Sequence, residues 1–584
     1  MLYPQSNLFR QTIDLSGLWD FRFDPEDQGT EGGWPDGLSD ARPIAVPASW
    51  NDQFADGRDY LGPAWYQTRF ALPWGWDQRR VNLRFGSVNY LAEVWLNGVR
   101  LGEHEGGHLP FAFEVTEYVQ REGNLLVVRV DGTLAPDRVP PGDIPLPSTD
   151  EDDENAPFPS GPFGAFPDTS FDWFPFCGIH RPVLLTATPH GGIDDLTVVT
   201  DIDGSAGLVR VRLEAGEATA ARFTLRGHGA DVSTEVDPTQ EGVLTVADAA
   251  LWSPDAPNLY DLTAELLKDD QVYDRYTLPV GIRTITVDGD ALLLNGRPIT
   301  LTGFGRHEDF PITGRGLVPA VIVKDYALLK WVGANSFRTS HYPYSEQMMD
   351  LADRLGFLVI DETPAAGLYF RQDGLERRTE LCRQYTRELI DRDKNHPSVI
   401  LWNLANEPDD STRPAAKEVF HELYSLAKTL DPTRPVTIVS YVGVAEESLE
   451  FCDVVCLNRY RGWYTQMGQL DKACALLSSE LDQVHEKFPK PLLLTEFGAD
   501  TIPGHHAQPP EMFSEEYQAE MLTRYVEVLN SKPFVVGHHV WNMCDFKTGQ
   551  AVHRFGGMNL KGVFTRDRRP KLAAHRLREL WGGE

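Results

Sequence analysis

The chain of 584 residues has few of the features that mark secreted, membrane-bound or nucleic-acid-binding proteins. Cysteine occurs only six times and without the spacing of a zinc site, so we expect six reduced thiols rather than a disulfide framework. No run of about 18 apolar residues is present, so we expect no membrane-spanning helix and no membrane partner. The first residues show no basic segment followed by an apolar one, so we expect no signal peptide and a cytoplasmic protein.

Basic residues are scarce relative to acidic ones. The chain has 54 Lys and Arg against 86 Asp and Glu, which gives a net charge of −32. Because nucleic acids are bound mainly by clustered cations, this balance argues against a nucleic-acid partner. Apolar residues reach 41 % and aromatic residues 11 %, which excludes disorder as the main state. We therefore expect a soluble protein with several packed cores.

Cofactor and metal motifs are also missing. No G-x-G-x-x-G precedes a helix, and there is no Walker loop and no G-x-S-x-G elbow. His104-Glu-Gly-Gly-His108 matches the zincin pattern, but its two glycines oppose the helix that zinc binding requires, so we expect a glycine turn. The acidic run at 150–154 lacks the glycine and distal glutamate of a calcium loop, so we expect a solvated loop. We therefore expect neither a metal nor a cofactor.

The pattern of apolar segments divides the chain into three domains. Residues 1–185 carry short, nearly alternating apolar runs separated by turn residues, which predicts an antiparallel β-sandwich. Residues 186–282 repeat this style over about a hundred residues with some seven strands, which is typical of an immunoglobulin-like sandwich. In residues 283–584, apolar runs alternate with helical stretches, which predicts a (β/α)8 barrel. The eight expected barrel strands are Ile299–Phe304, Ala334–Phe337, Phe357–Ile360, Ser398–Trp402, Pro435–Val439, Asp453–Leu457, Pro491–Leu494 and Val535–Val540.

Polar and titratable residues follow nearly every one of these expected strands. Catalytic groups of such barrels lie at the carboxyl ends of the strands, so these side chains should converge on one bowl that suits a hydroxyl-rich ligand. The residues at the strand ends are Arg306, His307 and Glu308; Arg338, His341 and Tyr342; Asp361 and Glu362; Asn403, Asn406 and Glu407; Ser440 and Tyr441; Asn458, Arg459 and Tyr460; Glu496; and Trp541, Asn542 and Asp545.

Two of these carboxylates form the best catalytic pair. Glycoside hydrolysis without a metal needs one carboxyl group as acid and a second as nucleophile or base. Glu407 ends an apolar strand before a proline, and Glu496 ends another before Phe-Gly. Their separation fits strands 4 and 7 of the barrel. Asp361 and Glu362 are rival carboxylates, which we interpret as buried ion-pair partners of Arg338 or Lys394.

Several longer segments resemble glycoside hydrolase family 2 and, within it, the bacterial-type β-glucuronidases. The family segments are Gly303-Phe-Gly-Arg-His-Glu-Asp309, Ala334-Asn-Ser-Phe-Arg-Thr-Ser-His-Tyr-Pro343, Lys394-Asn-His-Pro-Ser-Val, Trp402–Pro408 and Leu494-Thr-Glu-Phe-Gly498. The narrower resemblance rests on Leu457-Asn-Arg-Tyr460, Gly462-Trp-Tyr464, the Asn559-Leu-Lys561 motif, and the segments that begin at Val46 and Gly178.

The resemblance implies a retaining, exo-acting β-D-glucuronidase that forms D-glucuronate and an aglycone alcohol through a covalent glycosyl-enzyme. It also implies a jelly-roll-like sugar-binding first domain, no cofactor, a small-molecule glucuronide as substrate, and a homo-oligomer, either a dimer or a tetramer. Glu407 matches the general acid/base, with a raised pKa, and Glu496 matches the nucleophile, hydrogen-bonded by Tyr460. Asn559 and Lys561 match the motif that holds the sugar carboxylate, with Arg554 or Arg566 as a further cation. The other expected pocket residues are Asp172, His307, Asn406, Tyr460, Tyr464, Trp541 and Arg554.

Some positions depart from the family pattern, so the sequence does not decide which sugar the enzyme hydrolyses. Arg461 replaces an expected tyrosine, and the spacing from Arg554 to Asn559 is one residue longer than is usual in the family. The loop at 363–374 is shorter than in the enteric enzymes, which favours a more open entrance to the active site. A β-galacturonidase or dual uronidase therefore remains an alternative. A neutral-sugar β-galactosidase is less consistent, since it would leave Lys561 unpaired. The alternative from another class is a non-catalytic carbohydrate-binding protein, although the presence of both glutamates argues for an enzyme.

Overall fold

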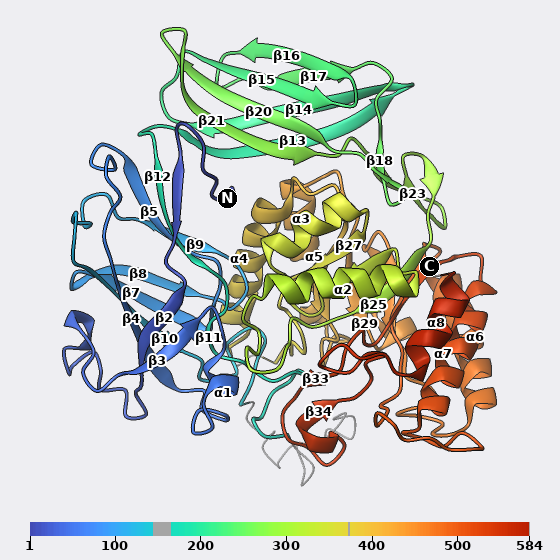
Figure 1. Cartoon of the computed structure of the whole chain (residues 1–584). Coiled ribbons are helices and arrows are strands. Elements are labelled where there is room, and N and C mark those ends of the chain that lie inside the picture. Colours follow the sequence, from blue (N-terminus) through green and yellow to red (C-terminus); the bar gives the residue numbers. More distant parts are fainter. Residues whose placement is uncertain (144–164, 372–373, 583–584) are drawn as a thin grey trace.

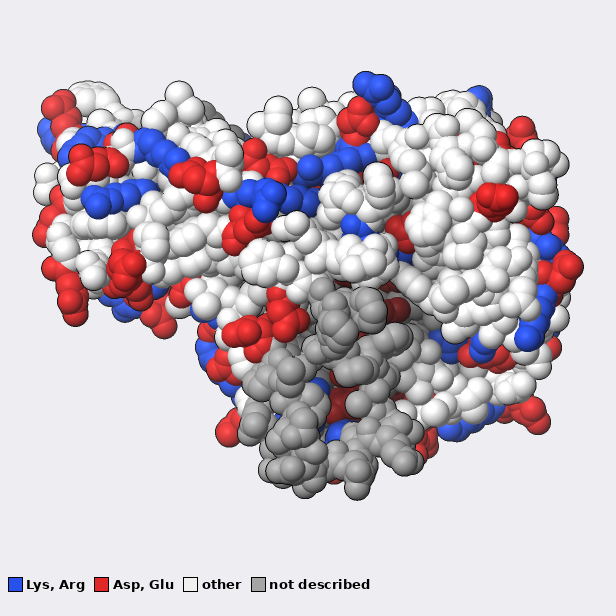
Figure 2. All heavy atoms as spheres, turned by 90° about the horizontal axis from the view of Figure 1, so that it is seen from below, with Lys and Arg blue, Asp and Glu red and all other residues white. Residues whose placement is uncertain are grey.

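The computed structural model describes residues 1–143, 165–371 and 374–582, arranged as two β-sandwiches and a barrel (Figure 1). The acidic run at 150–154 lies outside the described residues. The first sandwich lies beside the barrel, and the second lies above both in the view of Figure 1. No helix in the described part of the chain is both long and apolar enough to span a membrane. On the face in Figure 2, acidic and basic side chains are intermixed over the first sandwich.

The first sandwich packs a four-stranded sheet, in the order β1-β12-β5-β9, against a six-stranded sheet, in the order β3-β2-β4-β10-β7-β8. Strand β10 pairs with β4 and β7 and is buried on both faces. Leu126, Val128 and Val130 face the main core, whereas Leu125 and Val127 pack in a second cluster with Trp65 and Trp95. This double burial explains the nearly continuous apolar sequence of β10. The strands are β1 (Gln11–Asp14), β2 (Gly17–Phe23), β3 (Arg42–Val46), β4 (Pro63–Phe70), β5 (Arg80–Phe85), β7 (Leu91–Leu96), β8 (Val99–Glu105), β9 (Phe111–Glu114), β10 (Asn124–Asp131) and β12 (Val183–Thr188).

The zincin-like motif lies on a strand end and its turn. His104 belongs to β8, and Gly106 follows with a φ of 127°. The two histidines therefore do not share a helix face, and the expected glycine turn is confirmed. Close to this turn, the short strands β6 (Val88–Asn89) and β11 (Gly178–Ile179) pair with each other, and the short helix α1 (Trp50–Gln53) lies on the chain between β3 and β4.

The second sandwich has seven strands, as expected, in two sheets of the order β13-β14-β17 and β16-β15-β20-β21. Its core comes from alternating inward residues such as Phe223 and Leu225 of β15. The strands are β13 (Ile193–Asp203), β14 (Ala206–Ala215), β15 (Ala220–Gly227), β16 (Ala230–Val236), β17 (Gly242–Val246), β20 (Tyr260–Lys268) and β21 (Gln271–Val280), with the small pair β18 (Trp252–Ser253) and β19 (Ala256–Pro257). The domain limits predicted at 185 and 282 stay predictions, and position 185 lies within β12.

The eight expected parallel strands form a closed barrel, in chain order from β25 to β32. A three-stranded sheet precedes the barrel, and its Ile285, Leu292 and Leu294 share a core with the strand residues Leu301 and Leu358. The barrel strands are β25 (Leu301–Gly305), β26 (Ser336–Arg338), β27 (Leu358–Glu362), β28 (Val399–Asn406), β29 (Val436–Ser440), β30 (Val455–Asn458), β31 (Leu492–Glu496) and β32 (Val535–Val540), after β22 (Ile285–Asp288), β23 (Ala291–Leu294) and β24 (Arg297–Pro298).

Helices follow the barrel strands and cover them with their apolar faces, except between β29 and β30, where only the short 3-10 helices η2 (Gly443–Ala445) and η3 (Glu447–Glu450) occur. Sequence signals mark their ends: Ser345 caps α3 by accepting a hydrogen bond from Met348 N, and Gly333 ends α2 in the left-handed region at a φ of 85°. The helices are α2 (Pro319–Val332), α3 (Glu346–Leu355), α4 (Leu375–Asp393), α5 (Pro414–Leu430), α6 (Leu470–Lys487), α7 (Glu515–Asn530) and α8 (Leu572–Trp581).

The first sandwich and the C-terminal part of the chain meet at the carboxyl ends of the barrel strands. Phe166 and Gln550 exchange two backbone hydrogen bonds of 2.9 and 2.7 Å, and Phe174 N donates to Lys547 O at 2.8 Å. Lys547 lies on β33 (Phe546–Lys547), which pairs with β34 (Met558–Asn559). This contact brings residues near 172 from the first sandwich to the rim of the barrel.

Candidate active site

Glu407 and Glu496 lie at the carboxyl ends of two barrel strands, as expected. Glu407 directly follows β28 and adopts a left-handed φ of 44°, fixed by a hydrogen bond from its N–H to Val439 O at 2.9 Å. A positive φ is costly for a residue with a side chain, and such strain is concentrated at functional sites. Glu496 is the last residue of β31 and is 4 % exposed.

The two carboxyl groups are close enough for their charges to interact. Burial, together with the negative charge of Glu496, raises the pKa of Glu407 to about 7. Asn458, at the end of β30, donates a hydrogen bond to Glu407 Oε1 at 2.8 Å and another to Asn406 Oδ1 at 3.2 Å. Glu407 is therefore protonated in a large fraction of molecules at neutral pH, as a general acid must be. The expected raised pKa of this residue is thus found in the structure.

Several donors surround the Glu496 carboxylate and hold it in one orientation. Tyr460 Oη donates to Glu496 Oε2 at 2.6 Å, as expected. Arg338 donates to Glu496 Oε1, and His341 Nε2 lies 3.6 Å from the same oxygen. These contacts surround the carboxylate with hydrogen-bond donors and a guanidinium, which fixes the position of its two oxygens.

Arg338, at the end of β26, forms hydrogen bonds to residues at the ends of β27, β28 and β31. Its guanidinium pairs with Glu362 Oε2 at 2.5 Å and donates to Asn406 Oδ1 at 3.3 Å, in addition to its contact with Glu496. Glu362 also accepts a hydrogen bond from Asn403 and lies 2.8 Å from His341 Nδ1. The expected ion pair of Glu362 with Arg338 is confirmed, so this carboxylate supports the site instead of competing for the catalytic role.

The corresponding expectation for Asp361 is wrong. Asp361 accepts a hydrogen bond from Thr339 Oγ1 at 2.9 Å and pairs with neither Arg338 nor Lys394. Successive residues of a strand point to opposite faces, so Asp361 points away from Glu362 and meets the helix side of the barrel. There, burial and the nearby charge of Asp393 raise its pKa well above the usual range.

Aromatic side chains form one wall of the site. The ring of His341 lies between those of Trp173 and Trp541, with centroid distances of 5.3 and 4.9 Å. The ring of the expected pocket residue His307 packs edge-on against the ring of Trp541. Its Nδ1 is hydrogen-bonded to Tyr342 Oη at 3.0 Å. Trp173 comes from the first sandwich, so this wall is built from two domains.

A second cluster gathers the expected binding residues around a buried cation. Lys561 is 1 % exposed, and its ammonium pairs with Asp500 Oδ2 at 2.6 Å and donates to Tyr464 Oη at 2.8 Å. Arg554 Nε donates to Asp172 Oδ1 at 2.9 Å, and Asn559 Nδ2 donates to Asp172 Oδ2 at 2.8 Å. The expected residues Asp172, Tyr464, Arg554, Asn559 and Lys561 are thus all in one network.

The cation cluster and the carboxyl pair belong to one site. The rings of Tyr460 and Tyr464 are 5.3 Å apart, and the Lys561 ammonium lies 5.7 Å from the Tyr460 ring. Because Tyr460 donates to Glu496, a single tyrosine contacts both parts.

The structure corrects two expectations about cations. Lys561 is already paired with Asp500, so a neutral sugar would not leave it without a counterion. Arg566 pairs with Asp52 and Asp309 instead of joining the cluster. Arg461, which replaces an expected tyrosine, bonds to Glu480.

The sequence does not identify Asp500 and does not predict that Arg338 contacts Glu496 or that Trp173 contacts His341. Arg338 is expected only as an ion-pair partner of Asp361 or Glu362, and Trp173 is the neighbour of the expected residue Asp172. Asp500 follows Glu496 by four positions, and its only signal is an acidic residue shortly after a buried strand.

Three family models match the chain. They are described as glycosyl hydrolases family 2, sugar binding domain, at residues 12–189; glycosyl hydrolases family 2, at residues 192–283; and glycosyl hydrolases family 2, TIM barrel domain, at residues 285–583. A beta-glucuronidase of Paenibacillus borealis is 42 % identical over 100 % of this chain and 98 % of its own length. A beta-glucuronidase of Rattus norvegicus is 42 % identical over 99 % of this chain and 92 % of its own length.

Solved structures agree with these relatives. The β-D-glucuronidase of Dictyoglomus thermophilum superimposes with a TM-score of 0.91 at 40 % identity and covers 100 % of this chain and 99 % of its own. The β-glucuronidase of Ruminococcus gnavus in complex with D-glucuronic acid gives a TM-score of 0.91 at 37 % identity, with 99 % of each chain covered. The similarity therefore spans both sandwiches and the barrel.

Proposed function

The chain belongs to glycoside hydrolase family 2, and from this we propose that it is a retaining, exo-acting β-D-glucuronidase that forms D-glucuronate and an aglycone alcohol. The observation that carries this proposal is the pair of buried cations Lys561 and Arg554, with the Asn559 amide, beside the Glu407 and Glu496 pair. The names of the relatives support the same substrate.

In the proposed mechanism, Glu496 attacks the anomeric carbon while Glu407 gives its proton to the leaving glycosidic oxygen. The bond to the aglycone breaks and a glycosyl ester forms on Glu496. Water then attacks the same carbon from the face that the aglycone left, and Glu407 removes its proton, so the configuration is retained. The pKa of about 7 suits Glu407 to both proton transfers, because such a group gives and takes protons near neutral pH.

The sugar carboxylate is proposed to bind to Lys561 and Asn559. An ammonium has three N–H donors, and the bonds to Asp500 and Tyr464 leave one for a substrate. Because the protein carries −32, attraction of an anionic sugar has to come from such local cations. A charge-assisted hydrogen bond of this kind contributes about 1.5–3 kcal/mol.

A comparison of substrates tests the proposal. We expect the wild-type protein to hydrolyse p-nitrophenyl β-glucuronide much faster than the β-galactoside. Lys561→Ala should lower kcat/KM for the glucuronide by about 10- to 150-fold, as the loss of about 1.5–3 kcal/mol predicts, and should change the slow galactoside reaction far less. Lys472→Ala, on the exposed face of α6, is the matched control.

The same assay separates the alternatives. Faster hydrolysis of the β-galacturonide would replace the glucuronidase assignment with a galacturonidase of the same family. The absence of turnover with every uronide, together with retained binding, would identify a non-catalytic carbohydrate-binding protein.

We also propose that the enzyme is cytoplasmic and forms a homo-oligomer. The six cysteines are all buried and unpaired, which supports a reducing compartment. Light scattering of the purified protein tests the assembly, with a dimer or tetramer expected and a monomeric mass contradicting it.

A further inference from the structure

A small cavity lies between the first sandwich and the barrel, and its lining includes Trp173, whose ring also stacks on His341. Its volume is about 30 Å³, which is space for one or two small molecules or ions. Its described lining contains two arginines but no aspartate or glutamate. The polar lining residues are Asn89, Tyr90, His108, Thr133, Arg138 and Arg315.

Arg315 brings a buried positive charge to this cavity without a counterion. Its side chain is 5 % exposed, and no carboxylate of the described residues forms an ion pair with it. The neighbouring acid, Glu308, is held by Arg181 at 3.1 Å. The guanidinium lies 4.1 Å from the ring of Tyr342, and its Nε has no hydrogen-bond partner. Since arginine stays protonated, it cannot escape the cost of burial by losing its charge.

His108 supplies a second unpartnered group at the same place. Its Nε2 lies 3.5 Å from Arg315 Nη1, whereas its Nδ1 is buried without a partner. Burial and the charges of Arg315 and Arg181 lower the pKa of His108 well below its usual value, so the ring is neutral. When Nε2 accepts from Arg315, the proton is on Nδ1, which is then a buried donor. The same two arginines also lower the pKa of His180, which shows that the positive potential extends across this interface.

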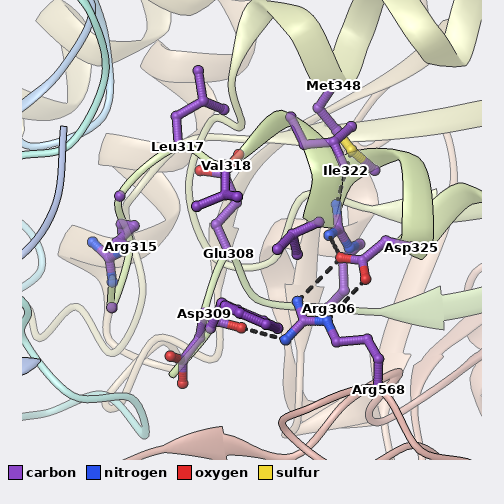
Figure 3. A pocket seen from close by; sticks show the side chains of 14 residues that line it. Arg306, Glu308, Asp309, Arg315, Leu317, Val318, Ile322, Asp325, Met348 and Arg568 are labelled. Carbon is purple, nitrogen blue, oxygen red and sulfur yellow. Dashed lines mark hydrogen bonds and ion pairs between the residues drawn. The ribbon is translucent and has the colours of Figure 1, made fainter. Parts of the chain in front are cut away.

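Arg315 also lines a second small cavity, whose lining contains acidic residues. This cavity, drawn in Figure 3, contains Asp325 between two arginines, with ion pairs of 2.5 Å to Arg306 and 2.9 Å to Arg568. Arg315 stands apart from this cluster, and no interaction connects it to the other residues drawn. Arg315 lines both cavities, but carboxylates line only the cavity of Figure 3, whereas the described lining of the cavity at the sandwich interface has none.

We propose that this cavity binds a small, singly charged anion, of the size of chloride or formate, at the Arg315 guanidinium. Arg138 of the first sandwich also lines the cavity, but its charge is matched by Asp131 at 3.6 Å, so Arg315 carries the unmatched charge and His108 contributes a neutral donor. The anion would connect the sandwich to the loop between β25 and α2 and so stabilise the contact between the two domains. The cavity shares Trp173 with the aromatic wall of the active site, but the anion proposal does not depend on the proposed function.

Thermal unfolding tests the site in solution. Sodium chloride should raise the unfolding midpoint of the full chain saturably, by about 1–3 °C, relative to the same concentration of a bulky sulfonate such as sodium HEPES. Arg315→Met should abolish the response or raise the half-saturating chloride concentration at least tenfold. Arg297→Met, at an exposed arginine of β24, should respond like the wild type. An equal response to chloride and sulfonate, or an unchanged response in Arg315→Met, would overturn the proposal.

A crystallographic measurement keeps the test independent of how the variant folds. Wild-type crystals grown in sodium bromide should give an anomalous peak within hydrogen-bond distance of Arg315. A cavity that holds only water under these conditions would contradict an anion site.

Discussion

Glu407 is the residue whose local chemistry most directly sets the proposed pH dependence. Its pKa of about 7, raised by burial and by Glu496, makes the protonated form the dominant one below neutral pH. The folded-state pKa is raised from the usual 4.5, so ionisation of this group costs stability as the pH rises through about 7. The raised pKa that makes Glu407 a general acid near neutral pH therefore also makes the folded protein less stable at alkaline pH.

The first prediction concerns the alkaline limb of the activity profile. Because the attack step needs protonated Glu407, kcat/KM for a glucuronide should fall tenfold per pH unit above about pH 7. Glu407→Gln should remove this limb when the substrate has a good leaving group, such as 2,4-dinitrophenol, which needs no proton. Initial rates from pH 5 to 9 decide the point, and a limb that persists in Glu407→Gln would assign it to another group.

At the scale of elements, the site depends on loops that fix the ends of strands. Asp500, on the segment after β31, accepts hydrogen bonds from Leu560 N at 2.8 Å and from the Lys561 ammonium at 2.6 Å. It also lies 3.4 Å from Arg554 Nη1. One buried carboxylate therefore joins the end of a barrel strand to the C-terminal loop that carries the cation cluster.

The second prediction follows from this role. Asp500→Asn leaves the buried Lys561 ammonium without a charged partner, while Arg554 keeps Asp172, so the free energy of unfolding should fall by roughly 2–4 kcal/mol. Since the orientation of Lys561 also changes, KM for the glucuronide should rise about tenfold while KM for a β-galactoside stays nearly constant. Denaturation and steady-state kinetics measure both effects. Asp471→Asn, at a carboxylate that is 94 % exposed, is the control.

If Asp500 were only structural, stability would fall while the ratio of the two KM values stayed unchanged. That outcome would separate its role in folding from a role in positioning the cation.

The barrel strands could be predicted because each is an apolar run between helical stretches, but their ends could not. The run Ser398–Trp402 stops at Asn403, whereas β28 continues to Asn406. Asn403 and Asn406 remain in the strand because they pair with Thr437 and Val439 of β29 while their side chains serve the site. A prediction based on runs of apolar residues ends a strand at its first polar residue, here Asn403.

Contacts between distant segments were also outside the reach of the sequence. Motifs could predict Glu407, Glu496 and Lys561, but Lys561 and Asp500 are 61 positions apart, and nothing local indicates their ion pair. The same holds for Arg338 and Glu496, separated by 158 positions. Such pairings are fixed by barrel closure, so they emerged only with the structure.

At the scale of the whole molecule, the first sandwich completes a site that the barrel alone would leave unfinished. Asp172 accepts hydrogen bonds from Arg554 and Asn559, and Trp173 stacks on His341. The segment that carries them is held to the C-terminal loop by the backbone bonds between Phe166 and Gln550. Domain packing therefore contributes directly to the geometry of the site.

The third prediction tests this contribution. Asp172→Ala removes the partner of Arg554 and Asn559, so kcat/KM for a glucuronide should fall about 10- to 100-fold. The side chain is 44 % exposed, so the unfolding midpoint should change little. Kinetics together with thermal unfolding check this, and Asp168→Ala serves as control. Unchanged kinetics would show that the sandwich only braces the barrel.

The central claim is that Glu496 forms a covalent bond to the sugar, and trapping of the intermediate tests it most directly. Incubation with 2-deoxy-2-fluoro-β-glucuronyl fluoride, followed by proteolysis and mass spectrometry, should locate one fluoroglucuronyl group on Glu496. An unlabelled, inactive protein or a label on Glu362 would contradict the account.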